Sequence, residues 1–271
     1  MPAAPELSVS NIAFPGPELG VAMALLRRLN VSAVEVAPYN VFGRWDISAA
    51  DLQTFRKTLA DAGLRCPAMQ GIVYNARGAH LFASDEARAA LYRHLVMIAK
   101  MAGALGATAC VFGAPKLRDP GDLPAQEARA IAVDFFRRIG PAFAAEGATL
   151  TFEPNARQYA CRFITTTAEA IDLVEEIDTE GIGLQIDTGT LFLEHEDPQI
   201  LIRAARHAAH AHVSEPDLAP LGTSGTDHRP VAAALRASGY RGSLSIEMRA
   251  AADWQAAIER AVALVRGTYL A

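Results

Sequence analysis

The chain has 271 residues, of which 51% are hydrophobic and 20% are charged, and its formal net charge is −5. This composition excludes a disordered chain, and the scattered Lys and Arg residues argue against a nucleic-acid-binding surface. No apolar run reaches the roughly 18 residues that span a bilayer. We therefore expect a protein that binds neither nucleic acid nor a membrane.

The cysteines and the N-terminus indicate the compartment. The chain has three cysteines, Cys66, Cys110 and Cys161, an odd number without a disulfide-framework spacing. Such cysteines are expected to be reduced thiols. The first ten residues, MPAAPELSVS, lack the basic segment followed by an apolar one that marks a signal peptide. We expect a cytoplasmic protein.

Short β-like runs alternate with helical patterns along the first half of the chain. Strands are expected within residues 7–14, 33–38, 65–72 and 108–115. Ser48 is a plausible N-cap for the helix that follows the second of these strands, and Gly63 its stop. A long helix is expected from about Asp85 to Leu105, ending at Gly106. A further helix carries Ile131, Phe135, Ile139 and Phe143.

The second half repeats the same alternation. Strands are expected within residues 149–155, 182–189, 210–216 and 242–248. Asp197-Pro198 predicts an N-cap and first helical residue, and the last helix carries Trp254, Ile258, Ala261 and Val265. Eight strand–helix units without a linker predict a parallel sheet and one (β/α)₈ TIM-barrel domain of class α/β over residues 1–271. A doubly wound open sheet is the rival, but NIAFPGPELG is not the G-x-G-x-x-G turn that it would want.

Four polar residues fall at the ends of consecutive expected strands. They are Glu153, Asp187, His212 and Glu247, each after an apolar run. Strand ends of this kind build the active site of a barrel. Unpaired carboxylates there would repel one another, and a divalent cation removes that problem. Three carboxylates and one imidazole suit Mn²⁺, Mg²⁺ or Co²⁺ with open positions for substrate oxygens. We expect Mn²⁺, with Co²⁺, Mg²⁺ or Zn²⁺ as alternatives.

The motifs FEPN, QIDTG, HAHVSEPDLAPLG, DH and GYRGSLSIEM resemble those of the xylose isomerase-like TIM-barrel superfamily, the sugar phosphate isomerase/epimerase group, over essentially the whole chain. In its ketose 3-epimerases a Glu, an Asp, a His and a Glu at these strand ends bind the metal, and the two Glu residues move the proton. The resemblance implies that Glu153, Asp187, His212 and Glu247 are the ligands and that Glu153 and Glu247 are catalytic. It also implies a small-molecule carbohydrate substrate, epimerised or isomerised through a metal-stabilised enediolate.

The chain departs from that epimerase pattern at two positions. The epimerases carry a substrate-contacting His three residues after the metal-binding Asp, where this chain has Thr190. They also carry a substrate-contacting Arg in the loop after the metal-binding His, near the place of Leu218. The metal-binding residues of the pattern are thus present while the residues that contact the sugar differ, which argues against a free ketohexose as substrate.

Further polar residues near strand ends are secondary candidates for substrate binding. Asn11, Glu35 and Gln70 could bind substrate hydroxyls or be satisfied polar groups of the barrel interior. Asn155 could orient Glu153 or make a turn. The remaining candidates are Lys116 and Arg118, for an anionic group, and His228, in a Gly-flanked loop that could close over the substrate. His210 is expected on the face of its strand opposite to His212, in a structural role.

Other functions remain open on the sequence alone. A dehydratase or lyase acting on a sugar-like or cyclitol ketone would use the same metal site. A non-catalytic sugar-binding barrel would keep the fold without the reaction. An endonuclease is disfavoured, because the third and fourth strands end in AMQG and VFGA without metal-binding histidines. Related barrels often pair, so a homodimer is left open.

Overall fold

A computed structural model describes residues 5–271 of the chain. Eight parallel strands form one sheet in the order β2-β1-β8-β7-β6-β5-β4-β3. The strands are β1 (Leu7–Ser10), β2 (Ala33–Glu35), β3 (Ala68–Met69), β4 (Ala109–Phe112), β5 (Thr149–Phe152), β6 (Ile182–Asp187), β7 (Ala208–Val213) and β8 (Ser243–Ile246). The expected (β/α)₈ barrel is confirmed.

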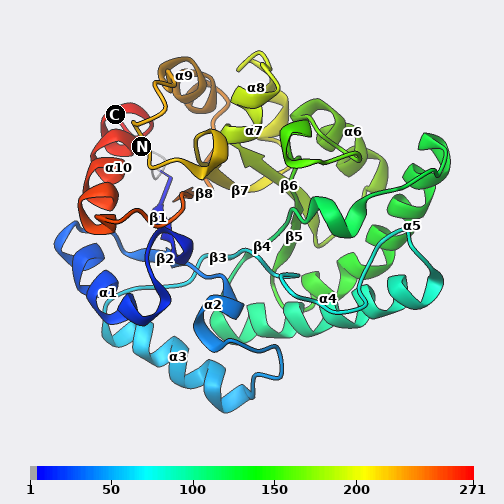
Figure 1. The fold of residues 1–271 in the computed structure, drawn as a ribbon, viewed down its shortest axis with the longest axis horizontal. Coiled ribbons are helices and arrows are strands. Elements are labelled where there is room, and N and C mark those ends of the chain that lie inside the picture. The colour runs from blue at the N-terminus through cyan, green and yellow to red at the C-terminus, as the bar shows by residue number, and fades with distance from the viewer. Residues whose placement is uncertain (1–4) are drawn as a thin grey trace.

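Helices surround the strands on the outside (Figure 1). The α-helices are α1 (Leu19–Arg28), α2 (Pro38–Phe42), α3 (Ala49–Asp61), α4 (Asp85–Leu105), α5 (Ala125–Ala144), α6 (Thr167–Ile177), α7 (Thr188–Leu193), α8 (Ile200–Ala204), α9 (Arg229–Ala237) and α10 (Trp254–Thr268). The short 3₁₀ turns are η1 (Asn11–Ala13), η2 (Gly16–Glu18), η3 (Pro115–Arg118), η4 (Arg157–Tyr159) and η5 (Pro216–Leu218). No helix within residues 5–271 is both long and apolar enough to cross a membrane.

The barrel closes between β2 and β3, the two ends of the strand order. Parallel bridges join Ala33 to Arg65 and Val36 to Met69. The backbone amide of Gln70 then donates to the backbone carbonyl of Val36 over 3.0 Å. Closure brings the carboxyl ends of all eight strands around one mouth, which is the functional end of this fold.

Aromatic packing anchors β4 and β5 beneath α5. Phe136 of α5 packs edge-on against Phe112 and Phe152, with ring centroids 5.4 and 5.2 Å apart. All three rings are buried. Side chains alternate between the two faces of a strand, so the outward Phe152 leaves Thr151 and Glu153 to the barrel interior and mouth. The apolar core thus holds the end of β5 where Glu153 emerges.

The helix boundaries agree with local chemistry in most places. Helix α4 spans the predicted Asp85–Leu105 and ends at Gly106, whose φ of 77° is left-handed. Ser48 caps α3 in a reciprocal capping box with Asp51. Two details of the prediction are wrong. Helix α7 was not expected, and α8 begins only at Ile200, with Gln199 rather than Asp197 at its N-cap.

Candidate functional site

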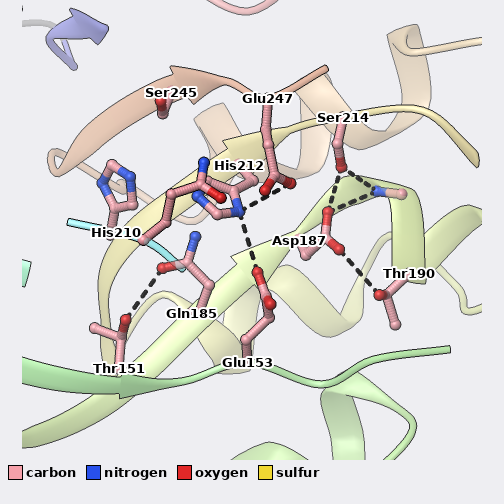
Figure 2. A network of polar contacts seen from close by, with 12 residues as sticks. Thr151, Glu153, Gln185, Asp187, Thr190, His210, His212, Ser214, Ser245 and Glu247 are labelled. Atoms are coloured by element: carbon pink, nitrogen blue, oxygen red, sulfur yellow. Dashed lines mark hydrogen bonds and ion pairs between the residues drawn. The ribbon is translucent and has the colours of Figure 1, made fainter. Parts of the chain in front are cut away.

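Three of the four strand-end residues meet at the mouth of the barrel. Glu153 follows the last residue of β5, His212 lies near the end of β7, and Glu247 follows the last residue of β8. His212 Nδ1 lies 3.1 Å from Glu153 Oε1 and 3.2 Å from Glu247 Oε2. Figure 2 shows the two carboxylates approaching the ring from opposite sides. One ligand atom from each residue lies within 4.8 Å of the other two, a spacing that a metal ion could bridge.

Asp187, the last residue of β6, lies beside this group but turns its oxygens away from it (Figure 2). Its Oδ1 accepts from the Ser214 hydroxyl and, over 3.0 Å, from the Gly189 amide. Its Oδ2 lies 3.0 Å from the Thr190 hydroxyl. Asp187 is therefore outside the 4.8 Å group of the described residues. The sequence did not indicate that Ser214 and Thr190 bind this carboxylate.

The electrostatics of the group favour a bound cation. Burial raises the pKa of Glu247 to about 7, with further increases from Glu153 and Asp187. Burial and Glu153 also raise the pKa of Asp187. Burial opposes the charged form of His212, but Glu247 and Glu35 outweigh it and hold its pKa well above the usual value. A site whose carboxylates resist ionising together, with one imidazole among them, fits a divalent cation that neutralises them.

A second polar layer lies directly beneath this group. Glu35 Oε1 is 2.9 Å from His212 Nε2 and 3.1 Å from His210 Nε2, and its Oε2 accepts from Ser245 and Gln70. Glu35 is completely buried. Burial opposes its ionised form, but His212 and His210 hold the pKa of this carboxyl well below the usual value. The layer joins β2, β7 and β8 and the residue after β3 under the candidate metal site.

His210 does not face away from His212, so the expectation about its direction is wrong. Both rings point into the barrel interior, with centroids 5.4 Å apart. Side chains two positions apart on a strand share one face, which places His210 one pleat below His212. The two-residue spacing of the histidines in HAH already indicates that they share one face of the strand.

A cavity of about 970 Å³ opens above the group. Its walls come from the loops after β3, β4, β5, β7 and β8. Glu153, Asp187 and Glu247 line its floor, and Tyr74, Leu117 and Leu218 belong to its apolar lining. The volume lies at the upper end of the range for small-molecule sites.

The secondary candidates divide between this cavity and the protein interior. Gln70, Lys116 and Asn155 line the cavity. The side chain of Asn11 instead binds the backbone of Ala37. Its Oδ1 accepts from the Ala37 amide over 2.8 Å, and its Nδ2 donates to the Ala37 carbonyl over 3.3 Å.

Three further candidates are also engaged inside the protein. Glu35 belongs to the layer below the site. Arg118 is fully buried against the backbone of Glu153, and His228 contacts Glu215 and Tyr269. These placements favour supporting roles for Asn11, Glu35, Arg118 and His228.

A family model described as xylose isomerase-like TIM barrel matches residues 23–267. The chain belongs to this family. The chain is also similar to an L-ribulose 3-epimerase of Mesorhizobium japonicum, with 31% identity over 104 residues that cover 38% of this chain. The matched segment spans 35%, about a third, of that relative's length.

Solved structures of sugar epimerases share the fold. An L-ribulose 3-epimerase matches with a TM-score of 0.83 at 20% identity, covering 98% of this chain and 95% of its own. A D-psicose 3-epimerase determined in the presence of D-fructose matches with a TM-score of 0.82 at 18% identity, over 97% and 99% of the two chains. The 3-keto-D-glucoside 4-epimerase of E. coli matches with a TM-score of 0.78 at 17% identity, over 97% and 99%. At these sequence identities the matches establish the fold of this chain.

Proposed function

We propose that the chain is a divalent-metal-dependent sugar isomerase or epimerase. The observation that carries the proposal is the placement of Glu153 and Glu247 on opposite sides of His212 Nδ1, at 3.1 and 3.2 Å, on the floor of a 970 Å³ cavity. The family and the epimerase activity of the relatives support the same interpretation.

Glu153, His212 and Glu247 would hold the cation, with Asp187 as the fourth ligand after rotation of its carboxylate. Mn²⁺ fits this oxygen-rich set with one nitrogen, and Co²⁺, Mg²⁺ or Zn²⁺ are alternatives. When bound, the cation supplies polarisation of a substrate carbonyl and stabilisation of the negative charge that forms on proton loss.

The two glutamates are the proposed proton carriers. They stand on β5 and β8, separated in the sheet by β6 and β7, so a substrate between them presents one face to each. One glutamate removes the proton from the carbon beside the carbonyl, and the other returns a proton to the opposite face, which inverts the centre. Return to the neighbouring carbon gives isomerisation instead.

The cavity walls support a carbohydrate substrate. Amide and hydroxyl groups of Gln70, Asn75 and Tyr159 line it and suit sugar hydroxyls. Arg77, Lys116 and Arg249 also line it, which extends the proposed range to sugar phosphates and other anionic sugars.

Metal content is the first test of the proposal. Wild-type protein purified without chelator should carry about one equivalent of a divalent metal, and His212→Ala and Glu247→Gln should lose it. His207→Ala is the matched control, because His207 pairs with Glu175 away from the mouth. Wild type that takes up neither Mn²⁺ nor Co²⁺ would contradict the proposal. For metal-loaded wild type, a second test is incubation with candidate sugars in D₂O. Deuterium incorporation without net loss of sugar would indicate an epimerase or isomerase rather than a dehydratase or lyase.

A further inference from the structure

Arg118, at the end of η3, is a completely buried arginine close to the candidate metal site. Its Nη1 donates to the backbone carbonyl of Glu153 over 2.8 Å, and its Nη2 donates to Asn155 Oδ1 over 2.9 Å. The guanidinium lies 4.6 Å from the centroid of the Phe152 ring. Its Nε has no hydrogen-bond partner among residues 5–271.

This arginine is costly to bury and does not gain its place through an ion pair. Among the described residues its guanidinium forms no salt bridge, and its hydrogen-bond partners are the Glu153 carbonyl, the Asn155 amide oxygen and, over 3.5 Å, Cys161 Sγ. Burying a charge without an opposite charge in contact costs several kcal/mol, on the order of the whole stability of many domains. A charge retained at that cost, one residue layer from Glu153, points to a task at the site.

The contact with Arg118 determines which way the Asn155 amide faces. A guanidinium only donates hydrogen bonds, so the Asn155 atom facing it must be the oxygen. The amide nitrogen is thereby turned to Glu153, and Asn155 Nδ2 donates to Glu153 Oε2 over 3.0 Å. With Oε2 engaged, Oε1 is the oxygen that faces His212 Nδ1. The arginine thus acts on the rotation of the Glu153 carboxylate through Asn155.

Gly113, which follows β4, makes room for this chain of contacts. A Cβ at Gly113 would overlap Glu153 Oε2 and would lie 3.2 Å from Asn155 Oδ1. Its φ is not in the left-handed region, so a Cβ at this position would displace the Glu153 carboxylate rather than strain the backbone. Gly113 and Arg118 lie in one segment after β4, GAPKLR, and both act on the carboxylate of Glu153.

We propose that Arg118 is a positioning residue that orients the Glu153 carboxylate toward the divalent cation by fixing the amide of Asn155. The inference rests on the proposed function, since it assigns Glu153 Oε1 as the metal-facing oxygen. It replaces the expectation that Arg118 binds an anionic substrate group.

The experiment is titration of metal-free protein with Mn²⁺ alone, by calorimetry, for wild type and variants whose folding is checked by circular dichroism and thermal melting. Arg118→Met keeps the bulk of the side chain and removes its donors, and Asn155→Leu removes the amide. Loss of a partner that orients a metal ligand typically weakens metal affinity by roughly ten- to a hundredfold. We expect a Kd increase of that size in both variants. Arg137→Met is the control for removal of an arginine elsewhere: Arg137 donates to the backbone carbonyls of Glu176 and Ile177 far from the site and, unlike Arg118, is exposed.

Coupling between the two variants separates a positioning role from a general loss of stability. If Arg118 acts through Asn155, Arg118→Met/Asn155→Leu should raise the Kd no more than the larger single effect. Folded Arg118→Met with a Kd within about twofold of wild type, or effects that multiply in the double variant, would overturn the inference.

Two further outcomes are also decisive. Should Arg118→Met fail to fold, an unchanged Kd in Asn155→Leu overturns the inference alone, and an increased Kd there supports it. Wild type that binds no Mn²⁺ overturns this inference and the proposed function together, whereas wild type that binds Mn²⁺ with unaffected variants overturns only the inference.

Discussion

Glu35 Oε1 lies 2.9 Å from His212 Nε2, at the edge of the imidazole opposite to the one that faces Glu153 and Glu247. The carboxylate accepts the Nε2 proton and thereby leaves Nδ1 as the nitrogen available to a cation. A carboxylate–histidine–metal arrangement of this kind fixes the tautomer and the ring orientation, and it raises the basicity of the ligand. The buried layer is therefore part of the site, although Glu35 itself does not line the cavity.

Replacing Glu35 tests that role. In Glu35→Gln the partner of His212 Nε2 loses its charge, so the affinity for Mn²⁺ should fall by about tenfold or more. Calorimetric titration of metal-free protein measures the change. Glu215→Gln is the control, because Glu215 is equally buried and also accepts from a histidine, His228, over 3.1 Å. That control should lose stability and keep its metal affinity. Equal affinities in Glu35→Gln and wild type would contradict the role given to Glu35.

The stability of the metal-free protein should decrease as the pH rises. The folded-state pKa of Glu247, about 7, exceeds its usual value of 4.5, and the pKa of His212 is also raised. Between those values the folded state binds more protons than the unfolded state, so this stability is present below pH 4.5 and is lost as the pH rises through about 7. The melting temperature without metal should thus fall between about pH 5 and pH 8, and Mn²⁺ should raise it more at the higher pH.

The control for this pH effect is Glu247→Gln, which should flatten the decrease. His94, whose pKa is lowered by burial, acts in the opposite direction and is common to both proteins. The difference between wild type and Glu247→Gln therefore isolates the site. A wild-type melting temperature that rises from pH 5 to pH 8 in parallel with that of the variant would contradict the assigned shift.

The barrel was predictable from the sequence because its elements repeat a simple pattern. Apolar runs of strand length, helical stripes and stop signals such as Gly106 alternate eight times, and each signal is local. Helix α7 was not predicted because it begins directly at the end of β6, with Asp187 itself as N-cap. A residue assigned to metal binding was thus also the start of a helix, and no loop separated the two elements.

The candidate site was predictable only in part. Strand-end position brought Glu153, His212 and Glu247 together correctly, because the fold converts that position into proximity. The partners of these residues depend on contacts between distant segments. Glu35 meets His212 across 177 positions and Arg118 meets the Glu153 backbone across 35, and no local pattern marks either contact. The sequence therefore suggested substrate contacts for Glu35 and Arg118, where the structure places both in the interior.

By the resemblance to ketose 3-epimerases, Thr190 takes the place of a substrate-contacting His, and here it is fully buried. Its hydroxyl lies 3.0 Å from Asp187 Oδ2 and 3.2 Å from the Pro154 carbonyl. Thr190→Val should therefore release Asp187 Oδ2 at a cost of about 1 kcal/mol of stability, while Oδ1 keeps its contacts with Ser214 and Gly189. If Asp187 must rotate to bind the cation, Mn²⁺ affinity stays equal or improves. A large loss of affinity, measured by the same titration, would mean that Thr190 holds Asp187 in its binding position. Thr188→Val, which loses a hydroxyl contact to Ser214 instead, is the comparison.

By the same resemblance, Leu218 lies near the place of an Arg in the epimerases, and it lines the cavity. Its backbone is left-handed, with a φ of 52°, and its carbonyl accepts from the Arg249 amide over 2.9 Å. Because the backbone is held by that contact, Leu218→Arg should change the cavity wall without moving the loop. A new charged donor to a sugar hydroxyl is worth roughly 1.5–3 kcal/mol, so kcat/KM for a free ketose should rise by about ten- to a hundredfold.

A panel of ketoses assayed by deuterium exchange measures the effect of Leu218→Arg. Leu218→Met is the control for side-chain size and should leave the panel unchanged. Since the native leucine and both replacement side chains would meet the same strained backbone, melting temperatures should differ little between wild type and the two variants. A gain for ketoses would mean that the wild-type wall selects against them, toward sugars that carry an apolar or anionic group. No gain in any ketose, with the variant folded and metal-loaded, would contradict the idea that Leu218 sets the sugar specificity.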